Sequence, residues 1–271
     1  MHIPFTKMQG AGNDFIVIES FDAAISLSPD QIRQLCHRRF GIGADGLILL
    51  AKSPKSDFDA QMIYFNANGS RGEMCGNGVR CLAAAAFDRG FGKNDKLRIL
   101  TDAGPVKAAL LKNDLYEVDM PEPTDFKLKI ELEIIGKQLL LHLINTGVPH
   151  IVHFCNDIDT INLANLGPAI RYHDAFSPQG VNVNIAQIDT DQTIRIRTYE
   201  RGVENETLAC GTGATATALI AHLLHKIEKP VPIEVASGEI LTVDFEKSGG
   251  QFSNVTLSGP AKTVFHGTFI L

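Results

Sequence analysis

Short runs of alternating hydrophobic and polar residues dominate the first half of the chain. FIVIES, LILLAK and AQMIYF occupy positions 15–20, 47–52 and 60–65, and runs of this length and period are typical of β-strands. A glycine-rich turn then leads into GNGVRCLAAAAFDRG at 76–90. Its apolar residues recur at helical spacing as far as Gly90, a residue type that commonly ends helices. The pattern therefore predicts strands followed by one helix.

The same order of elements recurs in the second half. GTGATATALIAHLLHKIEKP at 211–230 has its alanines at helical spacing and ends in lysines before Pro230, where basic residues favour the negative end of the helix dipole. Further strands are predicted after each helix: LRILT, VKAALL and LYEVDM in the first half, and PIEVA, ILTVDF and NVTLSG in the second. An additional helix is predicted to start at Ser28, because Ser-Pro-Asp-Gln at 28–31 forms a capping box.

Internal similarity suggests that the two halves are copies of one unit. CGNGV at 75–79 and CGTGA at 210–214 lie 135 positions apart. The same offset aligns GNDFIVI at 12–18 with GVPHIVH at 147–153, and Tyr64 with Tyr199, while DAGPVKAALL at 102–111 resembles ASGEILTVDF at 236–245. Four matches at nearly one offset predict an α/β (α+β) fold of two pseudo-symmetric halves.

The boundary between the halves is predicted at MPEPTDF, residues 120–126, because proline and acidic residues interrupt the strand pattern there. The first half then spans 1–119 and the second spans 120–261. The closing strand, 262–271, follows Pro260 and is expected to return to the first half.

Composition narrows the possible partners. The net charge is −6 with no long block of either sign, which argues against nucleic acid and anionic membranes as partners. The N-terminus carries no apolar segment typical of a signal peptide, and no apolar run approaches about 18 residues. Five cysteines, an odd number, indicate reduced thiols. We therefore expect a cytoplasmic protein.

Cys75 and Cys210 stand out among the five because each lies just before a G-x-G that opens a predicted helix. The amides at a helix N-terminus carry partial positive charge, so a thiolate there is stabilised and the pKa of the thiol is expected to fall. The same amides can bind a carboxylate. If a pseudo-twofold axis relates the two turns, they face each other across one cleft as an anion site with two reactive thiols.

This arrangement suits inversion of a carbon next to a carboxylate. Such a reaction removes a proton from one face and returns one to the other, which requires two groups that act as base and acid near neutral pH. Helix amides aimed at the carboxylate would stabilise the negative charge that develops there. A thiolate and a thiol on opposite faces could therefore work without any cofactor.

The other cysteines and glycine motifs favour structural interpretations. Cys36 shares an apolar helix face with Ile32, Leu35 and Phe40, and Cys81 and Cys155 are also expected in the core. GIGADG at 41–46 matches G-x-G-x-x-G but follows a helix and precedes a strand, the wrong order for a dinucleotide site. The sequence contains no C-x-x-C or H-E-x-x-H pattern, so zinc is not expected.

Three segments together resemble diaminopimelate epimerases: MQGAGNDFIVI, NANGSRGEMCGNGVRC and YERGVENETLACGTGA. The resemblance spans nearly the whole chain. Proline racemases share the architecture, but they typically carry His where this chain has Asn77 and they lack the ERG…ET-x-ACGTG block. The resemblance implies that each half is a mixed or antiparallel sheet wrapped around a central helix. It also implies a homodimer without a cofactor, with the active site in the cleft between the halves.

The resemblance further implies the reaction and its residues. The reaction is cofactor-independent epimerisation of LL-diaminopimelate to the meso isomer, which supplies lysine and peptidoglycan precursors. Cys75 and Cys210 match the proton donor and acceptor, and His150 and Glu200 match positions that tune the thiols. The matching substrate-binding positions are Asn13, Asn66, Gly76, Asn77, Asn182, Glu200, Arg201, Gly211 and Thr212. Arg201 suits a distal carboxylate, because guanidinium binds it bidentately.

The chain departs from the family pattern at three places. Val148 stands where many members have a substrate-binding Asn, Gly46 stands where many have Gln, and GVENE at 202–206 is one residue longer than usual. Asn145 or Thr146 could supply the hydrogen bond lost at Val148. These changes affect the substrate pocket and leave the thiols unchanged.

Three alternatives remain open on sequence alone. The chain could be a binding or redox protein whose close thiols form a disulfide. It could be an isomerase of this fold that uses a carboxylate base, although both cysteines are present. It could also be a racemase or epimerase that acts on a different amino acid.

Overall fold

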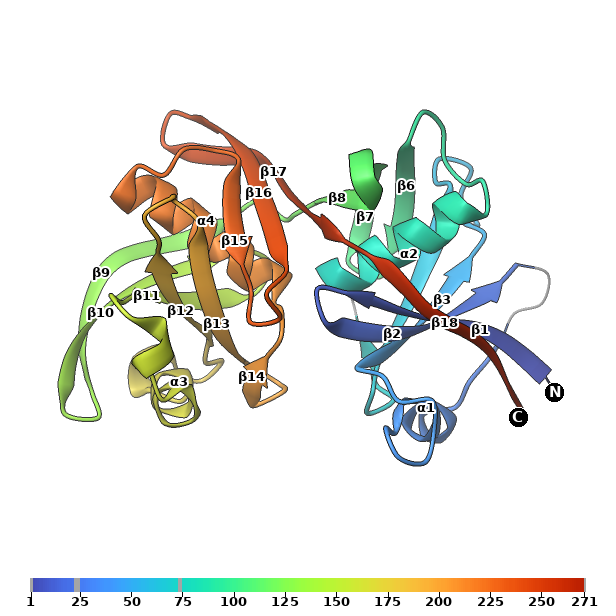
Figure 1. Ribbon diagram of the computed structural model, residues 1–271, viewed down its shortest axis with the longest axis horizontal. Helices are drawn as coiled ribbons and strands as arrows, with labels where there is room; N and C mark the ends of the chain where they lie inside the picture. Colours follow the sequence, from blue (N-terminus) through green and yellow to red (C-terminus); the bar gives the residue numbers. More distant parts are fainter. Residues whose placement is uncertain (1, 22–24, 73–74, 271) are drawn as a thin grey trace. The chain divides into compact units, whose positions relative to one another are not determined.

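The chain divides into two compact units. The computed structural model describes residues 2–21, 25–72 and 75–270 (Figure 1). One unit comprises residues 1–119 and 258–271, and the other comprises residues 120–257. Each unit contains a set of mixed parallel and antiparallel strands together with a few helices. None of the helices in the described ranges is long and apolar enough to cross a membrane.

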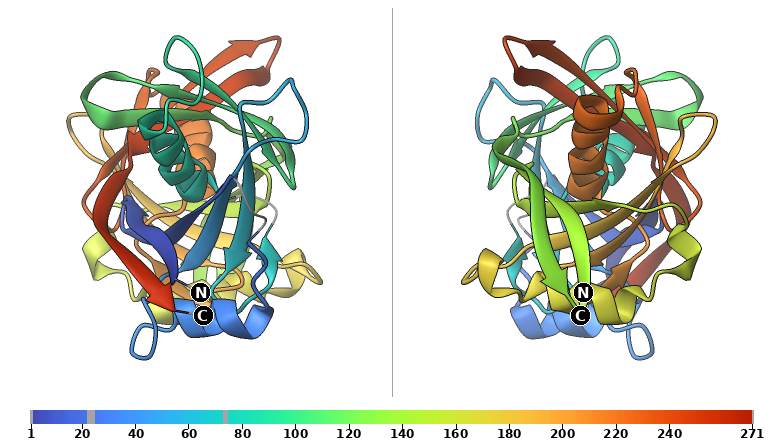
Figure 2. Two further views of the ribbon diagram at one scale, coloured as in Figure 1. Left: turned by 90° about the vertical axis from the view of Figure 1, so that its right-hand side faces the viewer. Right: turned by 90° about the vertical axis from the view of Figure 1, so that its left-hand side faces the viewer.

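The first unit is built on one mixed sheet. Antiparallel pairing joins β18 to β1, β1 to β2, β3 to β4, β6 to β7 and β7 to β8, whereas β2–β3 and β4–β6 are parallel. The left view in Figure 2 shows β18, in red, running along β1. The strands are β1 (His2–Gly10), β2 (Asn13–Ser20), β3 (Gly46–Ala51), β4 (Ala60–Asn66), β5 (Arg71–Gly72), β6 (Lys96–Thr101), β7 (Gly104–Leu110), β8 (Leu115–Asp119) and β18 (Lys262–Ile270).

The second unit repeats this plan. Strands β10–β11, β12–β13 and β15–β16 pair antiparallel, whereas β11–β12 and β13–β15 are parallel. β9 pairs with β10 at the edge, and the short β14 pairs with β13. The strands are β9 (Thr124–Ile134), β10 (Lys137–Asn145), β11 (Pro149–Phe154), β12 (Asn182–Ile188), β13 (Ile194–Glu200), β14 (Asn205–Thr207), β15 (Val231–Glu234), β16 (Ile240–Ser248) and β17 (Gln251–Pro260).

Strand registers align the two copies residue by residue. In the parallel pairs, Phe15 lies opposite Gly46 and His150 lies opposite Asn182. Tyr64 lies opposite Ile48, and Thr198 lies opposite Asn184. The counterpart of Tyr64 is therefore Thr198. The expected match of Tyr64 with Tyr199 is wrong by one position, because the offset of this strand is 134 rather than 135.

One long helix packs on the sheet of each unit. α2 (Gly76–Asp88) contacts β1, β2, β3, β4, β7 and β8, and α4 (Gly211–His225) contacts β10, β11, β12, β13, β15 and β16. Alanines make up much of both buried faces, including Ala83 and Ala86 in α2 and Ala214 and Ala218 in α4. Such small side chains allow close approach of helix and sheet. α2 ends before Gly90, whose φ is +75°, as its sequence predicts.

Helix α1 (Pro29–Cys36) begins with the predicted capping box. The Ser28 side chain accepts from the Gln31 amide, and the Gln31 side chain accepts from the Ser28 amide. Ile32, Leu35 and Cys36 are buried as expected, but Phe40 is 82% exposed. The expectation for Phe40 is wrong because the helix ends at Cys36, so helical spacing no longer determines which way residue 40 points.

Several segments differ from the sequence prediction. Strands β1, β5 and β10–β14 are additional to the strands that the pattern predicted. β9 begins at Thr124 and therefore includes the last residues of the predicted linker. Helix α3 (Leu163–Arg171) was not expected, because Gly167 and Pro168 lie inside it and both residue types disfavour helix interiors. The Asn162 side chain caps its N-terminus. At Gly167 an added Cβ would lie 2.5 Å from the Tyr199 ring, so close packing of α3 on β13 explains that glycine.

Candidate active site

Cys75 and Cys210 are the N-cap residues of α2 and α4. Their backbone angles are alike, with φ −139° and ψ 118° at Cys75 and φ −126° and ψ 109° at Cys210. Within the described residues, neither thiol forms a capping hydrogen bond with a backbone amide of its helix. By contrast, Ser28 and Asn162 cap α1 and α3 with their side-chain oxygens. The two thiols therefore occupy equivalent helix starts with partial positive charge.

Asn13 presents an acceptor to Cys75 in the first unit. The Asn13 Nδ2 atom donates to Asp45 Oδ2 at 2.7 Å. Because a carboxylate oxygen can only accept, the amide must point its NH₂ group at Asp45 and its oxygen at the thiol. The Cys75 Sγ atom donates to this Asn13 Oδ1 at 3.6 Å. The Asn77 Nδ2 atom donates to the same oxygen at 3.3 Å.

The buried guanidinium of Arg80 lies next to Asn77, on the side away from Asn13. Arg80 is fully buried, and its Nη2 atom donates to Asn77 Oδ1 at 2.7 Å. Its Nε and Nη1 atoms have no hydrogen-bond partner among the residues that the structure describes. Burial lowers the pKa of Arg80, whereas electrostatic attraction to Cys81 and Cys75 acts in the opposite direction. A charged Arg80 therefore favours the thiolate form of a nearby cysteine.

Cys210 faces a hydroxyl group in the second unit. Thr212 Oγ1 lies 3.4 Å from Cys210 Sγ and 2.9 Å from His150 Nε2. His150 is fully buried, and burial together with the charge of Arg201 lowers its pKa to about 3. The imidazole is therefore neutral at physiological pH. Thr212, Cys210 and His150, all predicted site residues, are thus brought together.

The predicted distal residues lie where β12 and β13 meet the site. Asn182 begins β12, and its Oδ1 atom accepts from the Arg201 amide at 2.8 Å. Arg201 directly follows β13 and donates from Nη1 to the Gln179 carbonyl at 3.3 Å. Glu200 ends β13 and accepts from the Thr207 hydroxyl at 2.9 Å. The second unit therefore places an acidic and a basic residue at adjacent positions at the end of one strand.

Asn66 occupies the corresponding strand end in the first unit. Its Oδ1 atom accepts from the Tyr64 hydroxyl at 2.9 Å, and its Nδ2 atom donates to Ser70 Oγ at 3.0 Å. Gly46 lies opposite Asn66 on β3. A Cβ at Gly46 would lie 2.7 Å from the Tyr64 ring and 2.8 Å from the Phe65 carbonyl oxygen, so this position has no space for the glutamine that the sequence resemblance leads one to expect.

Of the two residues expected to replace the hydrogen bond at Val148, Thr146 already uses its hydroxyl proton, whereas the role of Asn145 stays a prediction. Thr146 is fully buried, and its hydroxyl donates to the Thr212 carbonyl at 2.9 Å. Asn145 Oδ1 accepts from the Gly147 amide at 3.0 Å. Thr146 therefore uses its proton to hold the start of α4, and it contributes to the site by positioning Thr212.

The remaining cysteines occupy structural positions. Cys36 and Cys81 are buried, and burial raises the pKa of Cys36 to about 11 and that of Cys81 to about 12. Cys155 is half-buried beside the core of the second unit, and burial raises its pKa also. These three thiols therefore stay protonated near neutral pH.

Sequence reasoning missed Asp45, Arg80 and Asn184, which support the site from behind. Arg80 lies on a buried, alanine-rich helix face, where a charged residue is unusual. Asn184 interrupts an apolar strand in the same way, within NVNIAQI. Polar residues at positions that periodicity assigns to the core are the signal that could have revealed Arg80 and Asn184, whereas Asp45 is exposed just before β3 and carries no such signal.

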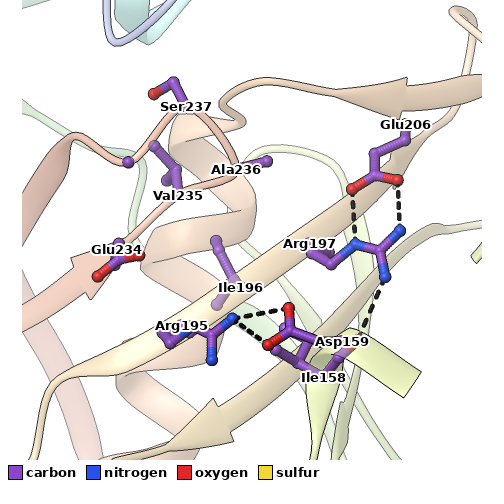
Figure 3. A pocket seen from close by; sticks show the side chains of 11 residues that line it. Ile158, Asp159, Arg195, Ile196, Arg197, Glu206, Glu234, Val235, Ala236 and Ser237 are labelled. Atoms are coloured by element: carbon purple, nitrogen blue, oxygen red, sulfur yellow. Dashed lines mark hydrogen bonds and ion pairs between the residues drawn. The ribbon is translucent and has the colours of Figure 1, made fainter. Parts of the chain in front are cut away.

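A separate pocket lies in the second unit (Figure 3). Arg195 pairs with Asp159 at 2.8 Å, and Arg197 pairs with Glu206 at 2.7 Å. Its arginines are therefore already neutralised by carboxylates, and the predicted site residues are absent from its described lining.

Comparison with known sequences gives one consistent result. The family model described as diaminopimelate epimerase matches residues 5–125 and 142–264. A diaminopimelate epimerase of Aquifex aeolicus (strain VF5) is 42% identical over 273 residues, which cover 97% of this chain and 96% of that protein. A diaminopimelate epimerase of Chlorobaculum tepidum is 40% identical over 267 residues, which cover 97% of this chain and 100% of that protein.

Comparison with solved structures shows the fold. A PhzF-family phenazine biosynthesis protein of Bacillus anthracis has a TM-score of 0.75 at 15% identity, with 100% of both chains covered. A probable proline racemase from Agrobacterium radiobacter K84 has a TM-score of 0.73 at 16% identity and covers 99% of this chain and 93% of that chain. These similarities are consistent with the predicted pseudo-symmetric halves.

Proposed function

Because this chain belongs to the diaminopimelate epimerase family of isomerases, we propose that it converts LL-diaminopimelate into the meso isomer. The reaction inverts one carbon next to a carboxylate and needs no cofactor in this proposal. Its product would serve the synthesis of lysine and of peptidoglycan precursors.

Cys75 and Cys210 carry the two proton transfers in this proposal. One cysteine, as thiolate, removes the Cα proton and becomes a thiol. The other, as thiol, donates its proton to the opposite face and becomes a thiolate. The enzyme's total number of protons is therefore unchanged, and the reverse reaction uses the same groups. The observation that carries this assignment is that each unit places one cysteine at the N-cap of its long buried helix.

The helix starts would bind the reacting carboxylate. Backbone amides at Gly76 and Asn77, and at Gly211 and Thr212, belong to the first turns of α2 and α4. Amides at helix N-termini bind anions, and they would stabilise the charge that moves into the carboxylate when Cα loses its proton. His150 and Glu200 would adjust the thiols without direct proton transfer to the substrate.

Charge favours diaminopimelate over an apolar amino acid. Arg201 and Glu200 suit the distal carboxylate and ammonium, and Asn13, Asn66 and Asn182 provide further amide groups. A side chain without charges would leave Arg201 and Glu200 partly desolvated without a partner, which is costly. The hydrogen bond lost at Val148 is worth only about 0.5–1.5 kcal/mol. The balance therefore supports retention of the zwitterionic substrate.

A substrate panel tests the proposal. We expect the purified protein to convert LL-diaminopimelate into the meso isomer, measured by chiral chromatography, and to leave other L-amino acids unchanged. Cys36→Ala is the matched control, because Cys36 is a buried thiol outside the site. Faster inversion of another amino acid would overturn the substrate assignment, and inversion by a Cys75→Ala, Cys210→Ala double variant would overturn the thiol assignment.

We also propose that the protein is cytoplasmic and forms a homodimer. Reactive thiols need a reducing compartment, which supports a cytoplasmic location. The family resemblance supports a homodimer. Sedimentation of the purified protein should give twice the mass of one chain, and a monomer that retains full activity would contradict this part of the proposal.

A further inference from the structure

Asn184 lies behind His150, is completely buried, and makes three side-chain hydrogen bonds that involve both of its polar atoms. Its Nδ2 atom donates to the Ile151 carbonyl at 2.9 Å and contacts His150 Nδ1 at 3.0 Å. Its Oδ1 atom accepts from the Thr198 hydroxyl at 2.9 Å. Buried polar groups that are hydrogen-bonded in this way specify one arrangement of their neighbours.

The Ile151 carbonyl determines the orientation of the Asn184 amide. A carbonyl oxygen can only accept, so the end of the amide that faces Ile151 must be the NH₂ group. The second hydrogen of that group then points at His150 Nδ1. The Nδ1 atom is therefore an acceptor and carries no proton.

This constraint determines which nitrogen of His150 is protonated. Burial, reinforced by the charge of Arg201, lowers the pKa of His150 to about 3, so the ring is neutral and carries one N–H. With Nδ1 accepting, the proton resides on Nε2 and is donated to Thr212 Oγ1 at 2.9 Å. Thr212 then directs its own hydroxyl proton at Cys210 Sγ, 3.4 Å away.

We propose that Asn184 is a positioning residue for Cys210: it holds His150 as the neutral Nε2–H tautomer and thereby makes the Thr212 hydroxyl a donor to the Cys210 sulfur. A donor that faces sulfur stabilises the thiolate. The role of Cys210 as a proton acceptor rests on the proposed function, but the direction of the hydrogen bonds does not.

Comparison of the two halves shows that the Asn184–His150 hydrogen bond occurs only in the second half among the residues that the structure describes. The counterparts of Asn184 and His150 are Ile48 and Phe15, neither of which can form side-chain hydrogen bonds. Gly213 provides the space that Asn184 needs, because a Cβ there would lie 2.3 Å from Asn184 Oδ1. The corresponding Cβ at Gly78 would meet the Ile48 methyl group at 3.2 Å.

Nuclear magnetic resonance of the histidine rings tests the tautomer directly. Long-range ¹H–¹⁵N spectra distinguish Nε2–H from Nδ1–H, and His150→Gln identifies the signals of His150. We expect Nε2–H in the wild type. Asn184→Asp has the same shape but places an accepting carboxylate oxygen at Nδ1, so we expect Nδ1–H. Thr198→Val is the control and should retain Nε2–H, because Ile151 still orients the amide.

Alkylation of Cys210 tests the effect on the thiol. Peptide mass spectrometry after brief iodoacetamide treatment reports the labelling rates of Cys75 and Cys210 in the same sample. We expect Asn184→Asp to slow labelling of Cys210 by about fivefold or more, because thiolate is the reactive form. Labelling of Cys75 should stay within about twofold of wild type, as should both rates in Thr198→Val.

The outcomes separate the steps of the proposal. Nδ1–H in the wild type, or Nε2–H retained in Asn184→Asp, would overturn the role of Asn184. A reversed tautomer with unchanged Cys210 labelling would overturn the link through Thr212. If Asn184→Asp does not fold, Asn184→Leu should give a mixture of tautomers, and pure Nε2–H would then be the contrary result. Neither measurement uses a substrate, so failure of the proposed function would be seen separately.

Discussion

Cys75 and Cys210 occupy the same place in two copies of one repeat, but the groups behind them differ in charge. Behind Cys75, Asn13 and Asn77 connect a carboxylate, Asp45, to the buried guanidinium of Arg80. Behind Cys210, the hydrogen bonds run through Thr212 and His150 to Asn184, and all three are neutral.

The comparison shows that a duplicated backbone can support one reactive group in two ways. A buried charge acts over several ångströms and is insensitive to small rotations, whereas a neutral hydrogen-bond chain depends on the direction of each proton. Arg80 has Thr215 as its counterpart, and Thr215 bonds within its own helix to the Gly211 carbonyl. Each half should therefore respond to a different kind of substitution.

Removal of either thiol should have the largest effect. If both halves contribute one acid or base, Cys75→Ala and Cys210→Ala should each reduce kcat for epimerisation by about 10³-fold or more, since positioned acid–base groups contribute about 10²–10⁴-fold. Chiral chromatography measures the loss. Circular dichroism should show an intact fold, with Cys36→Ala as the matched control.

The two single variants also distinguish the two faces of the substrate's Cα atom. Each should still exchange the Cα hydrogen of one stereoisomer with solvent, because the remaining thiolate faces one side of the carbon. We expect opposite stereoisomers to exchange in the two variants. The same stereoisomer exchanging in both would contradict the division of labour between the halves.

Substitution of Arg80 should affect the first half selectively. Arg80→Met removes the buried cation while retaining the volume, so kcat should fall by about tenfold or more. Unfolding temperature should change little, because relief from the cost of a buried charge offsets the loss of the hydrogen bond to Asn77. Steady-state kinetics and thermal unfolding measure both. Thr215→Val, its counterpart, should alter kcat by less than about threefold, because Thr215 bonds within its helix; an equal loss there would remove the contrast.

Arg201 provides a second asymmetry, because its counterpart in the first half is Ala67. Arg201→Lys retains charge but loses the planar guanidinium that binds a carboxylate at two points. If Arg201 binds the distal carboxylate as proposed, KM for diaminopimelate should rise about tenfold with kcat changed by less than about threefold, because that contact would be distant from the reacting carbon. A loss confined to kcat would instead place Arg201 at the reacting centre.

The pH dependence of stability should also differ between the halves, with a smaller effect. His150 in the second half is neutral when folded, with its pKa lowered from 6.5 to about 3. The unfolded chain therefore binds more protons between these values, and stability is lost as pH falls from 6.5 toward 3. The slope should be at most about 1.4 kcal/mol per pH unit for this histidine.

In the first half the half-buried Asp14 has a strongly shifted pKa, although it is not the repeat counterpart of His150. Burial raises the pKa of its carboxyl, but hydrogen bonds from Arg38 and Lys7 outweigh burial and lower it from 3.8 to about 2. Its contribution to stability is present above pH 3.8 and is lost only as pH falls toward 2. Urea unfolding from pH 7.5 to 4.5 should therefore become less pH-dependent in His150→Gln, while an unchanged slope would contradict the assignment to His150.

The sequence predicted the parts of the fold that follow from local pattern. The two Gly-rich helix starts, the capping box at Ser28, the strands β2–β4 and β6–β8 around α2, and the strands after α4 follow directly from residue spacing, whereas β1, β5 and β9–β14 were not predicted. Helix α3 was missed because packing on Tyr199 overrides the poor helix propensity of Gly167 and Pro168. Phe40 was misplaced because the end of α1 depends on the turn that follows, which hydrophobic spacing does not describe.

The supporting residues of the site were harder to predict. Asp45 and Asn184 lie 32 and 34 positions from the side chains that they hold, Asn13 and His150, and their roles depend on strand register. Arg80 lies only three positions from Asn77, but its burial depends on how α2 packs against the sheet. Asn184 reaches His150 only because β11 and β12 pair in parallel with His150 opposite Asn182. A single sequence does not contain that pairing, whereas the two candidate cysteines can be recognised from their positions directly before a helix.

Early product formation in deuterated water tests the central claim, that one thiol on each half acts on one carbon. Protio LL-diaminopimelate is incubated with the protein in D₂O, and both stereoisomers are isolated at low conversion and analysed by mass spectrometry. With two separate thiols, the proton is taken up by one and a solvent deuteron is delivered by the other. The meso product should therefore carry deuterium at the inverted carbon while the remaining substrate stays protio. Retention of the substrate's own hydrogen in the product would show that a single base serves both faces and would contradict the account.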